Sequence, residues 1–74
     1  MLSRITFNPH TMGGQACIRG MRIPVATVVK LVSNGKTIPE ILEEYPDLEK
    51  DDIKEALEYA AKLTEDRILE VSKG

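Results

Sequence analysis

The spacing of hydrophobic and polar positions changes at Pro24. Before it, residues 3–7 alternate between polar and apolar side chains and include β-branched and aromatic residues, which is typical of a short strand. A second short strand is expected at 17–19, after a glycine-containing loop, and Pro24 holds the residue before it extended. The first 23 residues therefore predict a β-hairpin with a glycine-containing loop. The positions expected to have a structural role are Gly13, Gly14, Gly20 and, directly after this segment, Pro24.

Beyond this point, apolar residues recur at the three- and four-residue spacing of one helix face. Pro24 suits the first turn of a helix, and Asn34-Gly35 offers a left-handed stop. The many valines also fit a strand leading into an Asn-Gly hairpin, but Pro39 would interrupt the return strand. We therefore expect a first helix. Its apolar stripe comprises Val25, Val28, Val29 and Val32.

Two more helices follow the first. Thr37 and Glu40 have the spacing of a capping box, and Pro46 ends this second helix near residue 44 or 45. A third helix begins after 46–49, with Asp51 and Asp52 in its first turn, where the helix dipole favours negative charge. The second stripe comprises Ile38, Ile41, Leu42 and Tyr45. The third comprises Ile53, Ala56, Leu57, Ala60 and Ala61.

The length of 74 residues predicts one domain and is too short for a TIM barrel or a Rossmann domain. We divide it into a hairpin with its loop (1–23), a three-helix core (24–63), and a helix extension or partner-binding arm (64–74). Two helices joined by about four residues have the layout of a helix-turn-helix. The fold class is thus mainly α, a three-helix helix-turn-helix domain with a short N-terminal β-hairpin.

So small a core offsets chain entropy only narrowly. The single cysteine cannot form an internal disulfide and the single histidine disfavours a protein-only zinc site, so we expect no cofactor and a homodimer or larger homo-oligomer. No apolar stretch approaches the ~20 residues of a membrane span, and the first residues lack the features of a signal peptide. We expect a cytoplasmic protein without membrane contact.

The acidic and basic residues are separated along the chain. Residues 1–36 contain five basic residues and no acid, whereas 37–74 contain twelve acids and five basic residues. Such separation indicates two electrostatic faces, two different partners, or complementary neighbours within a dimer. The net charge of -2 conceals this division.

Catalysis finds little support in these residues. His10 and Cys17 could form a base and a nucleophile, but no third group orients them and the domain has no room for a large pocket. Cys17 is more simply a small buried hydrophobe, and Gly13-Gly14 lacks the Walker and dinucleotide fingerprints. We expect no enzymatic activity.

Arg19 and Arg22 flank Gly20 in a stiff, acid-free segment, and the planar guanidinium suits carboxylates or phosphates. They could equally pair with acids of their own third helix or of a dimer mate. The third helix carries a net charge of -1 from residue 50 to 62, so any DNA binding needs the basic N-terminal half as well. Candidate nucleic-acid contacts are Arg4, Lys30, Lys36, Lys50 and Lys54.

Two runs carry a family resemblance: GGQACIRGMRIPV at 13–25, and ILEEYPDL at 41–48 followed by apolar positions to residue 61. They resemble the signature of the DUF 433 family, from about Arg4 to Ala61. The resemblance implies a small homeodomain-like helical domain with an N-terminal β element. Met21 stands where Thr is common, and Glu49-Lys50 where Thr-Pro is common, which leaves Asp47 or Glu49 to cap the third helix.

The resemblance also implies a function, because members are often regarded as antitoxins encoded beside a PIN-like ribonuclease, as in Vap-type pairs. An inserted arginine would pair with the metal-binding carboxylates of such a nuclease. The candidates are Arg19, Arg22 and Arg67. Such an antitoxin could also bind its own promoter DNA. The alternatives are a DNA-binding regulator without a toxin partner and a dimeric protein-interaction module.

Overall fold

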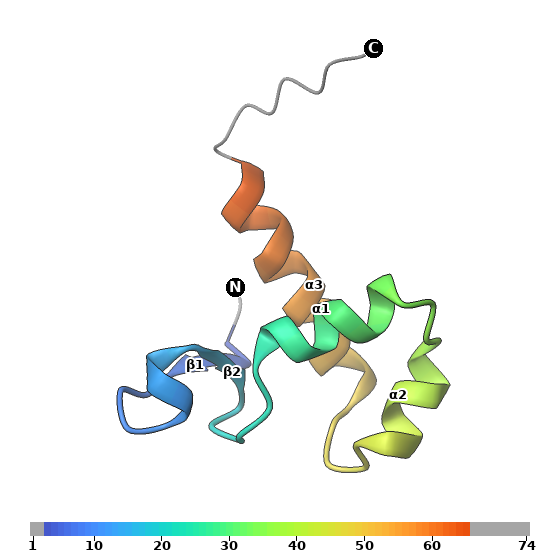
Figure 1. The fold of residues 1–74 in the computed structure, drawn as a ribbon, viewed down its shortest axis with the longest axis horizontal. Helices are drawn as coiled ribbons and strands as arrows, with labels where there is room; N and C mark the ends of the chain where they lie inside the picture. Colours follow the sequence, from blue (N-terminus) through green and yellow to red (C-terminus); the bar gives the residue numbers. More distant parts are fainter. Residues whose placement is uncertain (1–2, 66–74) are drawn as a thin grey trace.

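Between residues 3 and 65 the fold has a two-stranded hairpin, three helices and one 3-10 turn. The structure, a computed structural model, describes residues 3–65. The elements are β1 (Ile5–Phe7), η1 (Met12–Gly14), β2 (Ala16–Ile18), α1 (Val25–Ser33), α2 (Ile38–Glu44) and α3 (Lys50–Glu65). Figure 1 shows the hairpin beside α1 and the end of α3 rising away from both. The expected mainly α domain with an N-terminal hairpin is confirmed, and within residues 3–65 no helix is long and apolar enough to cross a membrane.

The hairpin is antiparallel, and Ile5 pairs with Ile18 at its open end. β2 ends at Ile18, so the expectation that residue 19 belongs to the strand is wrong. Arg19 and Gly20 have φ angles of 45° and 73°, and the Met21 N–H closes their turn by donating to the Ile18 carbonyl at 2.8 Å. These positive φ angles match the two central positions of a type I′ turn. A residue with such an angle cannot have the extended backbone of a strand.

The helix boundaries follow the local signals. Pro24 is the N-cap of α1, with ψ at 149°, so it stands just before the helix and not in its first turn. Gly35, with φ at 91°, follows the end of α1 as expected. The capping box of α2 is confirmed: the Glu40 N–H donates to Thr37 Oγ1 at 3.3 Å and the Thr37 N–H to Glu40 Oε1 at 2.8 Å.

The core lies where the three helices meet β2. Its buried hydrophobic side chains are Cys17, Ile18, Val25, Val28, Ile41, Leu48, Ile53 and Ala56. Val29 and Val32 are half-buried against this core, as are the remaining residues of the α2 stripe. On α3, Ala61 is exposed, which corrects its assignment to the buried face, because the last turns of α3 extend past the other elements (Figure 1).

α2 and α3 form the expected helix-turn-helix, joined by residues 45–49 and anchored by the buried Leu48. α3 also packs against α1 and β1, so the hairpin is supported by the helices of its own chain. The helix continues two residues beyond the expected boundary at 63, through Glu65. The remainder of the arm, 66–74, lies outside the described residues.

Candidate interaction surfaces

Asp52 is the one charged residue among the described residues whose side chain is fully buried. Arg4 Nη1 donates to its carboxylate at 2.8 Å, Arg19 Nη2 at 2.8 Å, and the Glu49 N–H at 2.7 Å. Arg19 Nε adds a further bond at 3.0 Å. A buried charge is tolerated when it is paired and hydrogen-bonded in this way.

These donors determine the charge state of Asp52. Burial raises the pKa of its carboxyl, but the hydrogen bonds from Arg19, Arg4 and the Glu49 N–H outweigh burial and lower the pKa to about 2. Asp52 is therefore an anion at neutral pH. Its bond to the Glu49 N–H is also the reciprocal half of a capping box, so Glu49 occupies the N-cap position of α3, one of the two positions the sequence offered.

Arg4 fastens the N-terminal strand to the start of α3. Its Nη1 lies 2.8 Å from Glu49 Oε1, and its backbone N–H donates to Glu55 Oε1 at 2.9 Å. Hydrogen bonds to Glu49 and then Asp52 raise the pKa of the Arg4 guanidinium. Arg4 was expected to contact nucleic acid, but its guanidinium binds Glu49 and Asp52 of its own chain.

Arg19 pairs with the acid of its own third helix, one of the alternatives open from the sequence. Besides Asp52, its Nη2 donates to the Asp47 carbonyl at 2.7 Å, so one side chain joins the turn after β2 to the α2–α3 connection and to the start of α3. The role of Asp52 as the shared partner of both arginines was not predicted from the sequence. The sequence held one indication of this role, which is that Asp52 lies three residues after Glu49 at the start of a predicted helix.

Arg22 has the opposite environment. Its side chain is exposed and has no ion pair or hydrogen bond with any residue from 3 to 65. Its backbone is nevertheless restrained. The Ile18 N–H donates to the Ile23 carbonyl at 3.0 Å, and the backbones of Cys17 and Pro24 pair in an antiparallel β-bridge. The guanidinium is thus presented on a fixed segment. The third predicted partner-binding residue, Arg67, lies outside the described residues.

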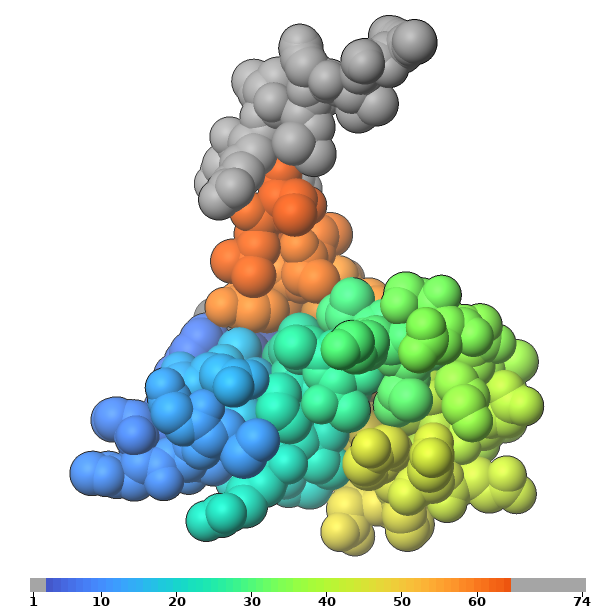
Figure 2. Space-filling view, in the orientation of Figure 1, coloured from blue at the N-terminus to red at the C-terminus, as the bar shows by residue number. Residues whose placement is uncertain are grey.

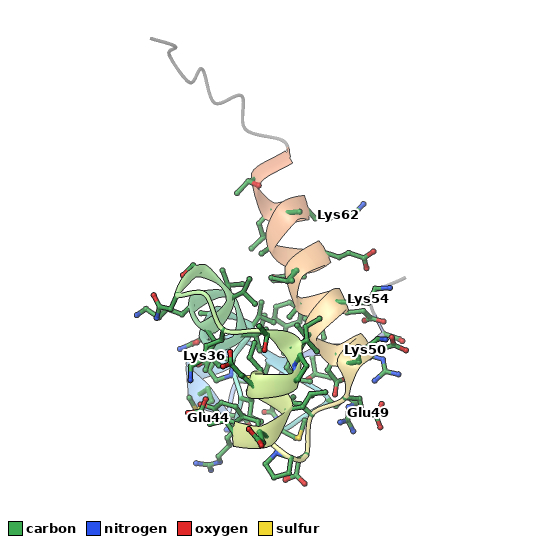
Figure 3. All side chains as sticks on the ribbon, turned by 90° about the vertical axis from the view of Figure 1, so that its right-hand side faces the viewer. Lys36, Glu44, Glu49, Lys50, Lys54 and Lys62 are labelled. Atoms are coloured by element: carbon green, nitrogen blue, oxygen red, sulfur yellow. The ribbon has the colours of Figure 1, made fainter. Side chains whose placement is uncertain are left out.

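The other basic residues do not share one face. Figure 3 shows Lys50, Lys54 and Lys62 along α3 and Lys36 across the body, towards α2. Lys36 Nζ lies 4.0 Å from Glu44 Oε1, while Lys30 is on α1. The basic residues expected to contact nucleic acid are therefore distributed around the domain.

An apolar groove runs between the hairpin, α1 and the protruding half of α3. We name it the α1–α3 groove; its volume is about 630 Å³, and residues lining it include Ala16, Ala26, Val29, Lys30, Tyr59 and Ala60. Figure 2 shows the last turns of α3 standing clear of the hairpin and α1. Leu63 forms part of the wall and is 58% exposed.

Phe7, also 58% exposed, continues this apolar surface from β1. Its ring meets that of Tyr59 edge-on, with centroids 5.9 Å apart and an interplanar angle of 62°. From the sequence, Phe7 was predicted only as a strand residue, and no role was predicted for Leu63. Exposed apolar side chains gathered on one face of a small domain mark an interaction surface.

The fold and these surfaces define a small helix-turn-helix domain with an N-terminal hairpin locked onto its third helix. A family model described as "Protein of unknown function (DUF433)" matches residues 5–60. The chain belongs to the DUF433 family. It is also similar to a solved DUF433 member protein from Anabaena variabilis ATCC 29413, with a TM-score of 0.76 and 39% identity over 80% of this chain and 58% of that one.

A curated relative is the "Uncharacterized protein y4eO" of Sinorhizobium fredii (strain NBRC 101917 / NGR234). It is 36% identical over 56 residues, which is 76% of this chain and 25% of that protein. The chain therefore spans about a quarter of this relative and somewhat over half of the solved neighbour.

Proposed function

We propose that this chain is the antitoxin of a type II toxin–antitoxin pair and inhibits a PIN-like ribonuclease. The observation that carries the proposal is Arg22, the exposed arginine on a restrained acid-free segment without an ion pair in residues 3–65. The side chains of Arg4 and Arg19 bind Asp52. Among the arginines predicted to bind a partner, Arg22 is therefore the one within residues 3–65 whose guanidinium is available.

Inhibition follows from the chemistry of the two sites. PIN-type nucleases hold a divalent metal with a cluster of carboxylates, and a guanidinium can bind two carboxylate oxygens at once. Arg22 placed in that cluster would compete with the metal for the same oxygens. The restrained backbone at Ile18, Ile23 and Pro24 reduces the entropy lost when the arginine docks.

The test measures RNA cleavage by a PIN-like ribonuclease copurified with the full chain. We expect the wild-type complex to be silent and Arg22→Ala to raise the cleavage rate roughly tenfold or more. Arg22→Lys, which keeps the charge but loses the planar fork, should give an intermediate rate. Lys54→Ala, an exposed change on α3, is the matched control and should remain silent.

Two results would count against the proposal. A chain that neither binds nor inhibits the ribonuclease would remove the antitoxin function. An Arg22→Ala complex as silent as the wild type would leave the pair intact but remove Arg22 from the mechanism. Excess Mn²⁺ or Mg²⁺ should relieve inhibition in the wild-type complex if the arginine competes with the metal.

A further inference from the structure

The segment that carries Arg22 is a short loop held at several points by its own chain. We name residues 19–22 the 19–22 loop. Its two ends meet at Ile18 and Ile23, where the Ile18 N–H donates to the Ile23 carbonyl at 3.0 Å. Arg19 and Gly20 both have positive φ angles, and a residue other than glycine keeps such an angle only where surrounding contacts determine it.

Three successive backbone N–H groups at the start of this loop have three different acceptors. The N–H groups of residues 19 and 21 donate to backbone carbonyls at 2.7 and 2.8 Å. Between them, the Gly20 N–H donates to Thr6 Oγ1 at 2.8 Å. The same hydroxyl donates to the Cys17 carbonyl at 3.4 Å, so it joins both strands of the hairpin to the loop. Thr6 is thus the one side-chain acceptor of the three.

The side chains on either side of Arg22 are also held by the domain. Met21 and Ile23 are half-buried against the core. Further back, Arg19 binds the Asp52 carboxylate through both Nε and Nη2. Arg22 is the exposed side chain among these, so the loop cannot change its direction without breaking contacts on both sides of it.

We propose that Thr6 is a positioning residue for Arg22. Its hydroxyl fixes the backbone of the 19–22 loop before a partner arrives, so the guanidinium meets the carboxylates of the ribonuclease with little loss of conformational freedom. Without this bond the loop has to become ordered on binding, and the complex dissociates faster. The inference rests on the proposed function and gives β1 a part in it.

Thr6 can be separated from the stability of the domain, whereas the other side-chain anchors of the loop cannot. A change at Arg19 or Asp52 breaks an ion pair to a buried carboxylate. In Thr6→Val, by contrast, the Gly20 N–H is at an exposed residue, where water can replace the hydroxyl. Valine has nearly the shape of threonine and favours strands, so β1 should be retained.

The experiment measures the dissociation constant between the full chain and the PIN-like ribonuclease of the proposed pair. Thr6→Val should raise this constant roughly fivefold, the effect of losing one hydrogen bond. Thr6→Ser keeps the hydroxyl and should bind like the wild type. Thr11→Val is the matched control, because the Thr11 side chain makes no capping bond to η1, and it should bind like the wild type as well. Circular dichroism confirms that each variant keeps its helices.

A double-mutant cycle with Arg22→Ala distinguishes positioning from a general structural role. Once the guanidinium is gone there is nothing to position, so adding Thr6→Val should change the dissociation constant by less than about twofold. Equal effects in both backgrounds would overturn the proposal, as would a Thr6→Val chain that binds as tightly as the wild type. A wild-type chain that does not bind the ribonuclease would instead overturn the proposed function, and the inference with it.

Discussion

At the residue scale, the main feature is that Asp52 is buried and yet charged. Burial alone would favour the neutral acid, but Arg4, Arg19 and the Glu49 N–H all donate to this carboxylate. The same contacts stabilise Arg19 at φ 45°, a backbone region that non-glycine residues seldom occupy. One carboxylate thereby connects the N-terminal strand, the turn after β2 and the start of α3.

Asp52→Ala should lower the free energy of unfolding by about 3 kcal/mol, because it leaves two arginines without their shared partner and removes the cap of α3. This expected loss is at the low end of the range for breaking a buried ion pair, because the side chains of Arg4 and Arg19 are 27% and 37% exposed and therefore partly solvated. Asp51→Ala, at a 65% exposed side chain, is the matched control and should stay within about 0.5 kcal/mol. Urea denaturation at pH 7 measures both, and equal effects would contradict the anchoring role.

Asp52 should also make stability depend on pH. Its folded pKa of about 2 lies below the ordinary 3.8, so its contribution is complete above about pH 4 and is lost as the pH falls toward about 2. Denaturation of the wild type and of Asp52→Asn from pH 6 to pH 2 isolates this residue from the other carboxyls. The difference in unfolding free energy should shrink over that window; a constant difference would mean that Asp52 does not titrate as described.

At the scale of elements, local signals determine where each helix begins and ends. α2 is only seven residues long, and its start is defined by the reciprocal bonds between Thr37 and Glu40 together with Pro39 in its first turn. The pKa of Glu40 is lowered by the Thr37 backbone N–H and then by its hydroxyl. So short a helix depends on its cap and on the burial of Ile41.

Thr37→Ala should destabilise the domain by about 1 kcal/mol, because it removes the acceptor for the Glu40 N–H. Ser33→Ala, at the exposed end of α1, should change stability by less than about 0.5 kcal/mol. Thermal unfolding followed by circular dichroism compares the two. A larger loss in Ser33→Ala than in Thr37→Ala would refute the capping assignment.

At the scale of the whole molecule, the charge separation along the chain is only partly retained as separate faces. Arg4 and Arg19 from the basic half bind acids at the start of α3, so part of the opposite charge is neutralised within the domain. Arg22, in the segment before α1, and Lys30, beside the α1–α3 groove, are exposed and form no ion pair with any residue from 3 to 65. Protein association is therefore better supported than a cationic nucleic-acid surface.

DNA binding should consequently be weak and insensitive to sequence. The lysines lie on different sides of the domain, and α3 carries acids next to Lys50 and Lys54. We expect fluorescence anisotropy with the chain's own upstream DNA and a scrambled duplex to give equal affinities that fall steeply between about 50 and 200 mM salt. A preference for the upstream DNA at near-physiological salt would instead make the helix-turn-helix a sequence reader.

The sequence by itself determined the order of the helices and placed their ends to within one or two residues, because capping residues, prolines and apolar spacing act within a few positions of one another. Thr37 with Glu40, Pro24 and Gly35 needed no knowledge of the fold. Only the tertiary structure decided which arginine is paired, since Arg4 and Arg19 reach Asp52 across 48 and 33 positions of the chain. The α1–α3 groove likewise exists only where α3 passes beyond the core, because its walls come from three elements that no local pattern relates.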